Sequence, residues 1–477
     1  MLFDSPVFFA FLLVVVPLYW LLNRRRQNIF LLLASYVFYG WWDWRFLGLI
    51  LISTVVDFFC ARAIAASDDS RKRKALLVLS LVVNLTFLGF FKYFNFFIDS
   101  LTPALGSLGV HVSVTTLRIL LPPGISFYTF QEVAYIVDVY SGKLKPADSI
   151  VDYALFISLF PHLIAGPIQR PDHLLPQVQR ERTFDAPKFF DGIMLIITGL
   201  FRKCVTANGC ALVADAAFGG RFGPPSVVTV ALGTYAFAWR IYGDFSGYSD
   251  IARGSAQLMG FHFMVNFRQP YLARSIQDFW RRWHISLSTW LRDYLYIPLG
   301  GNRRTETRTY GNLLTTMLIG GLWHGANWTF VVWGGIQGVG LAVERLWNRL
   351  SGRADPGESR TPGGASLLHG WWQRVIVFHF VCFAWVFFRA TSARAAVSFL
   401  TGLGVWSWRP EFAPAMMYLV LLAVPLFLLD LLLEHRREEY PLAHSSYRAR
   451  LLCATGLFVS VLLFSANQAS AFIYFQF

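Results

Sequence analysis

The sequence predicts an all-α polytopic membrane protein. A chain of 477 residues has room for about 10–13 transmembrane helices of roughly 20 residues each, together with re-entrant and interfacial helices. Of these residues, 55% are hydrophobic and only 15% are charged, whereas soluble proteins average about 25% charged residues. The formal net charge is +14, which in a polytopic protein is typical of basic cytoplasmic loops. We therefore expect membrane lipids, and no nucleic acid, among the partners.

Residues 7–140 are expected to form the N-terminal helices, because apolar runs and basic clusters alternate there with consistent sidedness. The apolar runs are residues 7–22, 28–42, 46–66, 75–98 and 119–140. The basic clusters at 24–26 and 71–74 are expected to be cytoplasmic. The loop 99–116 has one acid and no Lys or Arg, as expected of an external loop. No small-x-small site follows the first run, so we expect an anchor there and no cleaved signal peptide.

Residues 151–350 are expected to form the catalytic core, where this regular pattern ends. The run 153–165 is too short to span comfortably and is expected to be re-entrant. Further spans are expected at residues 189–217 and 227–264. The second of them contains GDFSGYSD at 243–250, whose two carboxylates indicate a broken helix that lines a cavity. Arginines alternate with aromatic residues over 267–308, which is typical of amphipathic helices at the membrane interface.

Residues 371–477 are expected to form the C-terminal helices. Spans are expected at residues 371–388, 416–433 and 451–472, with a cytoplasmic loop at 435–437. A polar loop rich in Gly, Pro and Arg precedes them at 351–364. The sequence has no internal repeat and no soluble domain of any size, so residues 1–477 are expected to form a single integral-membrane domain.

One histidine is the main candidate for catalysis. Residues 309–343 contain no Asp, Glu, Lys or Arg, and His324 lies in their middle, within GGLWHGANW. An ionisable side chain in such a run is costly in lipid and usually serves a function, and imidazole transfers protons near neutral pH. The alternative is a histidine that packs helices together through a hydrogen bond.

His284, within WRRWHISLSTWLRDY at 280–294, is the second candidate. Its alternative role is that of an interfacial histidine bonded to a backbone carbonyl. His162 could line the re-entrant turn, although packing is the favoured interpretation. Neither His284 nor His324 has a second metal ligand at i+3 or i+4, so no metal site is expected.

Five short motifs, in one order along the chain, resemble those of membrane-bound O-acyltransferases (MBOATs). They are FPHLIAGPI at 160–168, DFSGYSD at 244–250, WRRWH at 280–284, LRDYLYIPLGG at 291–301 and GLWHGA at 321–326. The sequence is most similar to the bacterial branch that O-acetylates exopolysaccharides such as alginate. The resemblance implies helices around a central tunnel in the bacterial cytoplasmic (inner) membrane. The acyl donor would enter from the cytoplasm and the acceptor from the other side.

The resemblance also implies roles for the residues. His324 matches the invariant histidine of the family and would remove the proton of the acceptor hydroxyl. His284 matches a second functional position, which is Asn or Asp in many eukaryotic members. It would orient the acceptor or the donor, or stabilise the tetrahedral oxyanion, and we expect it to act by donating a hydrogen bond. The acyl donor would be acetyl-CoA, with no bound cofactor. Further residues could bind the donor or line the tunnel: Arg281, Arg282, Arg292, Asp293, Tyr294, Trp323, Asn327, Ser246, Tyr248, Asp250 and His162. For the arginines, anchoring at the cytoplasmic face is the alternative.

Two other functions are compatible with the sequence. Within the family, the alternative is D-alanyl transfer to teichoic acid. A polysaccharide exporter or transporter, from a different class, would also have broken helices and buried polar groups, but transporters often have two similar halves. We expect no extracytoplasmic domain in these residues that could hold a polymer. The resemblance therefore favours an extracytoplasmic acetyltransferase as a partner protein, with a polysaccharide as acceptor.

Overall fold

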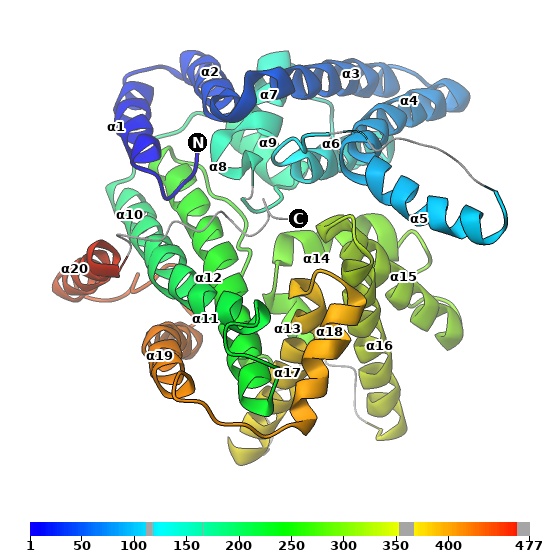
Figure 1. Ribbon diagram of the computed structural model, residues 1–477. Coiled ribbons are helices and arrows are strands. Elements are labelled where there is room, and N and C mark those ends of the chain that lie inside the picture. The colour runs from blue at the N-terminus through cyan, green and yellow to red at the C-terminus, as the bar shows by residue number, and fades with distance from the viewer. Residues whose placement is uncertain (111–116, 118, 165, 353–366, 465–477) are drawn as a thin grey trace. The chain divides into compact units, whose positions relative to one another are not determined.

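The computed structural model describes residues 1–477 except 111–116, 118, 165, 353–366 and 465–477. In this part of the chain every regular element is a helix (Figure 1), which confirms the predicted all-α fold. The chain folds into two compact units. The first comprises Met1–Ile196 and Ile251–Met264, and the second comprises Ile197–Asp250 and Val265–Phe477.

The first unit begins with helices whose starts are fixed by capping side chains. Ser5 caps α1, Asn23 caps α2 and Asp69 caps α4, and each accepts a hydrogen bond from a backbone N–H of the first turn. The helices and turns of this unit are α1 (Pro6–Trp20), α2 (Arg24–Asp43), η1 (Trp44–Phe46), α3 (Leu47–Ala65), α4 (Ser70–Leu88), η2 (Gly89–Tyr93), α5 (Phe94–Ser107), α6 (Ile125–Tyr140), α7 (Ile150–Ser158), α8 (Phe160–Leu163), α9 (Pro171–Gln179) and most of α10 (Ala186–Leu200). The predicted re-entrant run forms the short, buried α7 and α8, and its residue 165 lies outside the described residues.

The second unit contains the remaining elements. They are η3 (Phe201–Ala207), α11 (Asn208–Phe218), α12 (Val227–Leu258), η4 (Pro270–Leu272), α13 (Ile276–Arg282), α14 (Ile285–Leu291), η5 (Arg292–Tyr296), α15 (Glu306–His324), α16 (Trp328–Leu350), α17 (Leu367–Arg389), α18 (Ala393–Leu400), η6 (Thr401–Gly404), α19 (Phe412–Arg436) and α20 (Tyr447–Phe464). The last turns of α12 belong to the first unit. Helices α15 and α16 pack side by side (Figure 1). Most of the expected loop 351–364, residues 111–116 of the expected external loop and residues 465–472 of the last expected span lie outside the described residues.

Five segments of the described chain are long and apolar enough to cross a membrane. They are Arg24–Ala65, Ser70–Ser107, Gly370–Arg389, Phe412–Arg436 and Tyr447–Phe464. Less than half of each most apolar window is buried inside the protein. Large apolar side chains on the surface of such helices can face lipid hydrocarbon. The helices therefore support a multi-pass membrane protein.

Helix α12 runs without interruption through residues 243–250, so the predicted break in this helix is wrong. Its glycines allow the helix to lie directly against the backbone of η3 and the residues before it. A Cβ added to Gly247 would lie 2.6 Å from the carbonyl oxygen of Gly199, and one added to Gly243 would lie 2.8 Å from that of Arg202. The glycines therefore indicate close helix packing.

We expect Gly247→Ala to lower the free energy of unfolding by about 1–3 kcal/mol, the usual cost of overpacking a tight contact. The added Cβ would overlap backbone atoms of Gly199 and Lys203, which cannot move without displacing η3. Thermal unfolding of the purified protein in detergent measures the effect. Gly456→Ala in α20 is the control, because a Cβ there meets no atom within 4 Å. Equal melting temperatures for the two variants would contradict the packing argument.

Candidate functional site

His324 is the last residue of α15, at the tight turn into α16. Glycines make this turn possible, because a Cβ on Gly321 or Gly325 would overlap Phe330 of the facing helix. Asn327 caps α16 by accepting a hydrogen bond from the Thr329 N–H (2.9 Å). The uncharged run around His324 therefore forms two helices, α15 and α16, and the contact of Asn327 caps the second of them.

The imidazole of His324 is 4% exposed and is enclosed by three aromatic side chains, Trp323, Trp333 and Phe388. Their ring centroids lie 5.1, 5.1 and 5.4 Å from that of His324, in edge-to-face arrangements. Such contacts are favourable and directional, so they restrict the orientation of the imidazole. This aromatic cage also replaces water around the ring.

The structure brings His284 next to His324, with ring centroids 6.2 Å apart. His284 is fully buried between α13 and α14. Its backbone is left-handed, with φ 43° and ψ 52°, a conformation that is uncommon for a residue with a side chain. Strained backbone conformations of this kind concentrate at functional sites. Trp323, whose ring centroid is 5.8 Å from that of His284, contacts both histidines.

Asn266 determines which nitrogen of His284 carries a proton. Its Oδ1 accepts hydrogen bonds from the Ser286 backbone N–H (3.3 Å) and hydroxyl (2.9 Å), and faces His284 Nδ1 at 3.0 Å. A backbone N–H can only donate, so the atom that faces it is the amide oxygen, and Nδ1 must carry the proton. Full burial disfavours the charged imidazolium. In the neutral ring, Nε2 therefore has a lone pair and no proton.

This tautomer bears on the role expected for His284. A neutral His284 can accept a hydrogen bond at Nε2, but it cannot donate one from that atom. The donor role expected from the sequence would require a second proton on the ring. Asn266 was not among the site residues predicted from the sequence, because its only local signal is one amide within the largely apolar segment FHFMVNF at 261–267.

Asp244 and Asp250 bind basic residues of η3 inside the second unit. Asp250 pairs with Arg202 at 3.3 Å, and Arg202 also pairs with Asp430 of α19 at 3.3 Å. Asp244 pairs with Lys203. Breaking a buried ion pair leaves an uncompensated charge, so these contacts hold α12, η3 and α19 together. Asp250, expected to line the tunnel, has a structural contact here.

Arg281 and Arg292 line a cavity of about 640 Å³ together with Arg345. The cavity also contacts Met317, on the helix that ends at His324, and Ile285, which follows His284. One carboxylate, Glu344, contributes to the wall. Guanidinium groups bind phosphate through paired hydrogen bonds, so this cavity can hold a phosphorylated molecule. Its wall includes residues that lie near His284 and His324 in the sequence.

Several basic and aromatic candidates of this region, Arg292 of the cavity wall among them, bond to their neighbours. Arg292 Nε donates to Asp293 (2.7 Å), and Tyr294 packs against Trp290. Arg282 pairs with Asp278 and Glu434, both at 2.8 Å. Burial alone would lower the pKa of Arg282, but its hydrogen bonds to these two carboxylates raise it above the usual range. Arg282 therefore stays charged and does not line the cavity.

Three expected tunnel residues are buried. Ser246 and Tyr248 lie on α12 in the second unit and are completely buried. His162 lies on α8 in the first unit, where its Nδ1 is 3.2 Å from Gln131 Nε2 and its ring packs against Phe263. These contacts favour the packing interpretation of His162.

The sequence matches the membrane-bound O-acyltransferase family over residues 146–388. It is 49% identical to a probable alginate O-acetylase AlgI of Azotobacter vinelandii over 72% of this chain and 69% of that protein. The corresponding protein of Pseudomonas aeruginosa is 46% identical, over 83% and 73%. A peptidoglycan O-acetyltransferase of Helicobacter pylori is 36% identical, over 84% and 80%. Teichoic acid D-alanyltransferases match at 31% identity or less, over at most 56% of this chain.

Replacing Asp430 tests the ion-pair network. We expect Asp430→Leu to lower the free energy of unfolding by about 3–5 kcal/mol, because it removes one buried partner of Arg202 and the acceptor of the Tyr242 hydroxyl. The melting temperature in detergent is the measurement. Glu411→Leu, at the exposed start of the same helix, is the matched control. Similar melting of the two variants would argue against a structural role for the network.

Proposed function

The chain belongs to the membrane-bound O-acyltransferase family, and from this premise we propose that it transfers acetyl groups from acetyl-CoA for O-acetylation of an exopolysaccharide such as alginate. The observation that carries the proposal is the adjacent, buried pair His284 and His324, with ring centroids 6.2 Å apart. The relatives of 46% and 49% identity, named probable alginate O-acetylases, support acetyl as the acyl group and alginate as the model for the acceptor.

His324 is the proposed general base. A hydroxyl is a poor nucleophile near pH 7, and a base that removes its proton during attack typically accelerates the reaction about 10²–10⁴-fold. The acceptor oxygen bonds to the thioester carbonyl carbon while its proton passes to His324. The C–S bond of the tetrahedral intermediate then breaks, and the CoA sulfur leaves with the proton held by His324. The aromatic cage supports this role because it orients the imidazole and limits competing hydrolysis.

His284 is the proposed orienting residue. Its Nε2 lone pair accepts a hydrogen bond from the acceptor and turns the reacting hydroxyl toward His324. Asn266 is a positioning residue, because it keeps the proton on Nδ1 and the lone pair on Nε2. A sugar has several hydroxyls, so one can react while a neighbouring one bonds to His284.

The cavity lined by Arg281, Arg292 and Arg345 is the proposed site of the CoA phosphates. Arg292 and Arg345 also pair with Asp293 and Glu306, and Glu344 is part of the wall. Three guanidinium groups around one space still suit a polyphosphorylated donor better than an uncharged one. We propose that this cavity opens to the cytoplasm, where acetyl-CoA is found, and that the protein lies in the bacterial cytoplasmic membrane. An extracytoplasmic acetyltransferase partner would hold the polysaccharide, whose hydroxyl receives the acetyl group at the histidine pair.

The alternatives are less well supported. D-alanyl transfer to teichoic acid is favoured only by matches that cover 56% of the chain or less, whereas the O-acetylase matches cover 72% and 83%. Polysaccharide export has no support from membership of an acyltransferase family.

His324→Ala should abolish acetylation, because no other side chain in the aromatic cage accepts a proton near neutral pH. Polymer-bound acetate, measured in a deletion strain that carries the variant, reports the activity, and immunoblotting of membranes reports its level. His444→Ala, at an exposed position, is the matched control and should acetylate normally. Normal acetylation by His324→Ala would remove the catalytic assignment.

Asn266 variants test the tautomer of His284. Asn266→Leu removes the acceptor for Nδ1 and should lower activity about 10–100-fold, as is usual when a partner that orients a functional histidine is lost. Asn266→Asp keeps an acceptor, but its carboxylate raises the pKa of His284. Because the proposed role requires the neutral ring, the acid limb of the pH–rate profile should move to higher pH.

The measurement is acetyl transfer by the purified protein in detergent across a pH series, with His284→Ala as the reference for complete loss. Full activity of Asn266→Leu, together with an unchanged profile for Asn266→Asp, would exclude the positioning role of Asn266.

A further inference from the structure

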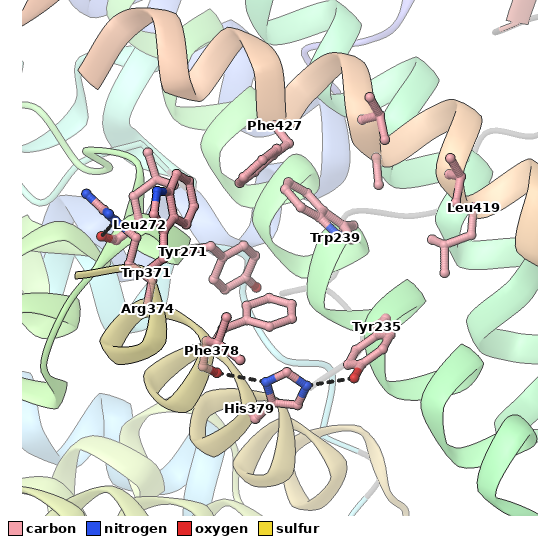
Figure 2. A pocket seen from close by; sticks show the side chains of 14 residues that line it. Tyr235, Trp239, Tyr271, Leu272, Trp371, Arg374, Phe378, His379, Leu419 and Phe427 are labelled. Atoms are coloured by element: carbon pink, nitrogen blue, oxygen red, sulfur yellow. Dashed lines mark hydrogen bonds between the residues drawn. The ribbon is translucent and has the colours of Figure 1, made fainter. Parts of the chain in front are cut away.

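A second pocket of the second unit, of about 380 Å³, lies apart from the histidine pair and is almost entirely apolar. Figure 2 shows aromatic and aliphatic side chains of α12, α17 and α19 around it. Its lining residues are Tyr235, Trp239, Tyr271, Leu272, Trp371, Arg374, Val375, Phe378, His379, Leu419, Val420, Ala423, Val424 and Phe427. The volume falls within the range of about 300–1,000 Å³ that is usual for ligand sites.

The pocket lies between helices whose length and composition suit the hydrocarbon of the membrane. Two of its walls, α17 and α19, are among the segments long and apolar enough to span. Its side chains Trp371, Val420 and Val424 are 42%, 57% and 42% exposed, and exposed apolar groups on spanning helices contact lipid. Acyl chains of membrane lipids can therefore enter this pocket.

Two polar side chains inside the pocket, those of His379 and Tyr235, bond to each other. His379 Nδ1 donates to the Val375 carbonyl (2.7 Å), so its Nε2 accepts from the Tyr235 hydroxyl (2.8 Å). Figure 2 shows this pair along one edge. This part of the pocket is consequently suited to a hydrocarbon chain.

One end of the pocket is positively charged. Figure 2 shows Trp371 and Arg374 together at one end and Leu419 at the other. Arg374 Nε donates to the Leu272 carbonyl (3.2 Å), and its guanidinium lies 4.7 Å from the Trp371 ring centroid. One hydrogen bond leaves most of the five guanidinium donors of Arg374 available for an anion.

Other charged groups near Arg374 also contribute to the electrostatic potential at this end of the pocket. The neighbouring charged groups are Arg274, Glu434, Arg282 and Asp278. Arg282 pairs with both carboxylates. The three guanidinium groups of Arg274, Arg282 and Arg374 outnumber the two carboxylates, so three positive and two negative charges leave this end of the pocket with a net charge of +1.

We propose that this pocket binds an anionic glycerophospholipid, with one acyl chain among the aromatic side chains and the phosphate at Arg374. An apolar pocket that ends in arginine and tryptophan matches the chemistry of such a lipid, since basic sites between membrane helices bind anionic headgroups and tryptophan favours the headgroup region. Tyr271 connects the pocket to the histidine site, because it also stacks on Trp283, the residue before His284. The proposal does not depend on the acyl-transfer reaction.

Native mass spectrometry of the full chain in detergent tests the proposal. The probes are phosphatidylglycerol, which is anionic, and phosphatidylcholine with the same acyl chains. Wild type should retain phosphatidylglycerol preferentially. Arg374→Gln should lower its retention about five-fold, the value of one basic residue near a lipid surface, and Arg374→Lys should retain it within about two-fold of wild type. Val424→Trp, which places a ring in the pocket at a partly exposed position, should lower retention of both lipids.

Arg394→Gln is the matched control, since Arg394 is exposed in α18, beyond the other end of α17. Equal retention of the two lipids by wild type would overturn the proposal. Equal losses in Arg374→Gln and Arg394→Gln, or full retention by Val424→Trp, would also overturn it.

Discussion

The need to compensate buried charges and buried histidine nitrogens determines much of the second unit. A polar or charged group removed from water is costly unless it is bonded within the protein, and lipid offers no replacement for water. Arg202 meets this requirement with Asp250 and Asp430, which belong to different helices. His284 meets it with Asn266. Bonds formed for stability thereby also fix the geometry and the protonation of the candidate site.

Close backbone contacts bring the two histidines together. Gly321 and Gly334 allow α15 and α16 to approach until their backbones touch, and His324 stands where these helices meet. The aromatic cage then fills the remaining space around its ring. Since packed interiors do not deform continuously, a methyl group added to this interface would change the position of His324 as well as the stability of the protein.

The features of the site that depend on local sequence patterns could be predicted from the sequence. Those that depend on contacts between distant segments could not. The uncharged run around His324 is a local pattern, and so are the apolar runs that predict the helices. The interpretation of Asp244 and Asp250 as marks of a broken helix was wrong, because their partners Arg202 and Lys203 lie in another segment, and no local pattern identifies such pairs. Asn266 was missed for the same reason. The catalytic roles themselves remain predictions.

The left-handed backbone at His284 limits which amino acids can occupy this position. Among residues with a side chain, Asn, Asp and His enter this region most readily. The amino acids compatible with this position are therefore limited by φ and ψ before any chemistry is considered. Asn and Asp, which we expect at this position in eukaryotic members of the family, also adopt the left-handed conformation readily. At position 284 a carboxamide could therefore replace the imidazole without a change of backbone conformation.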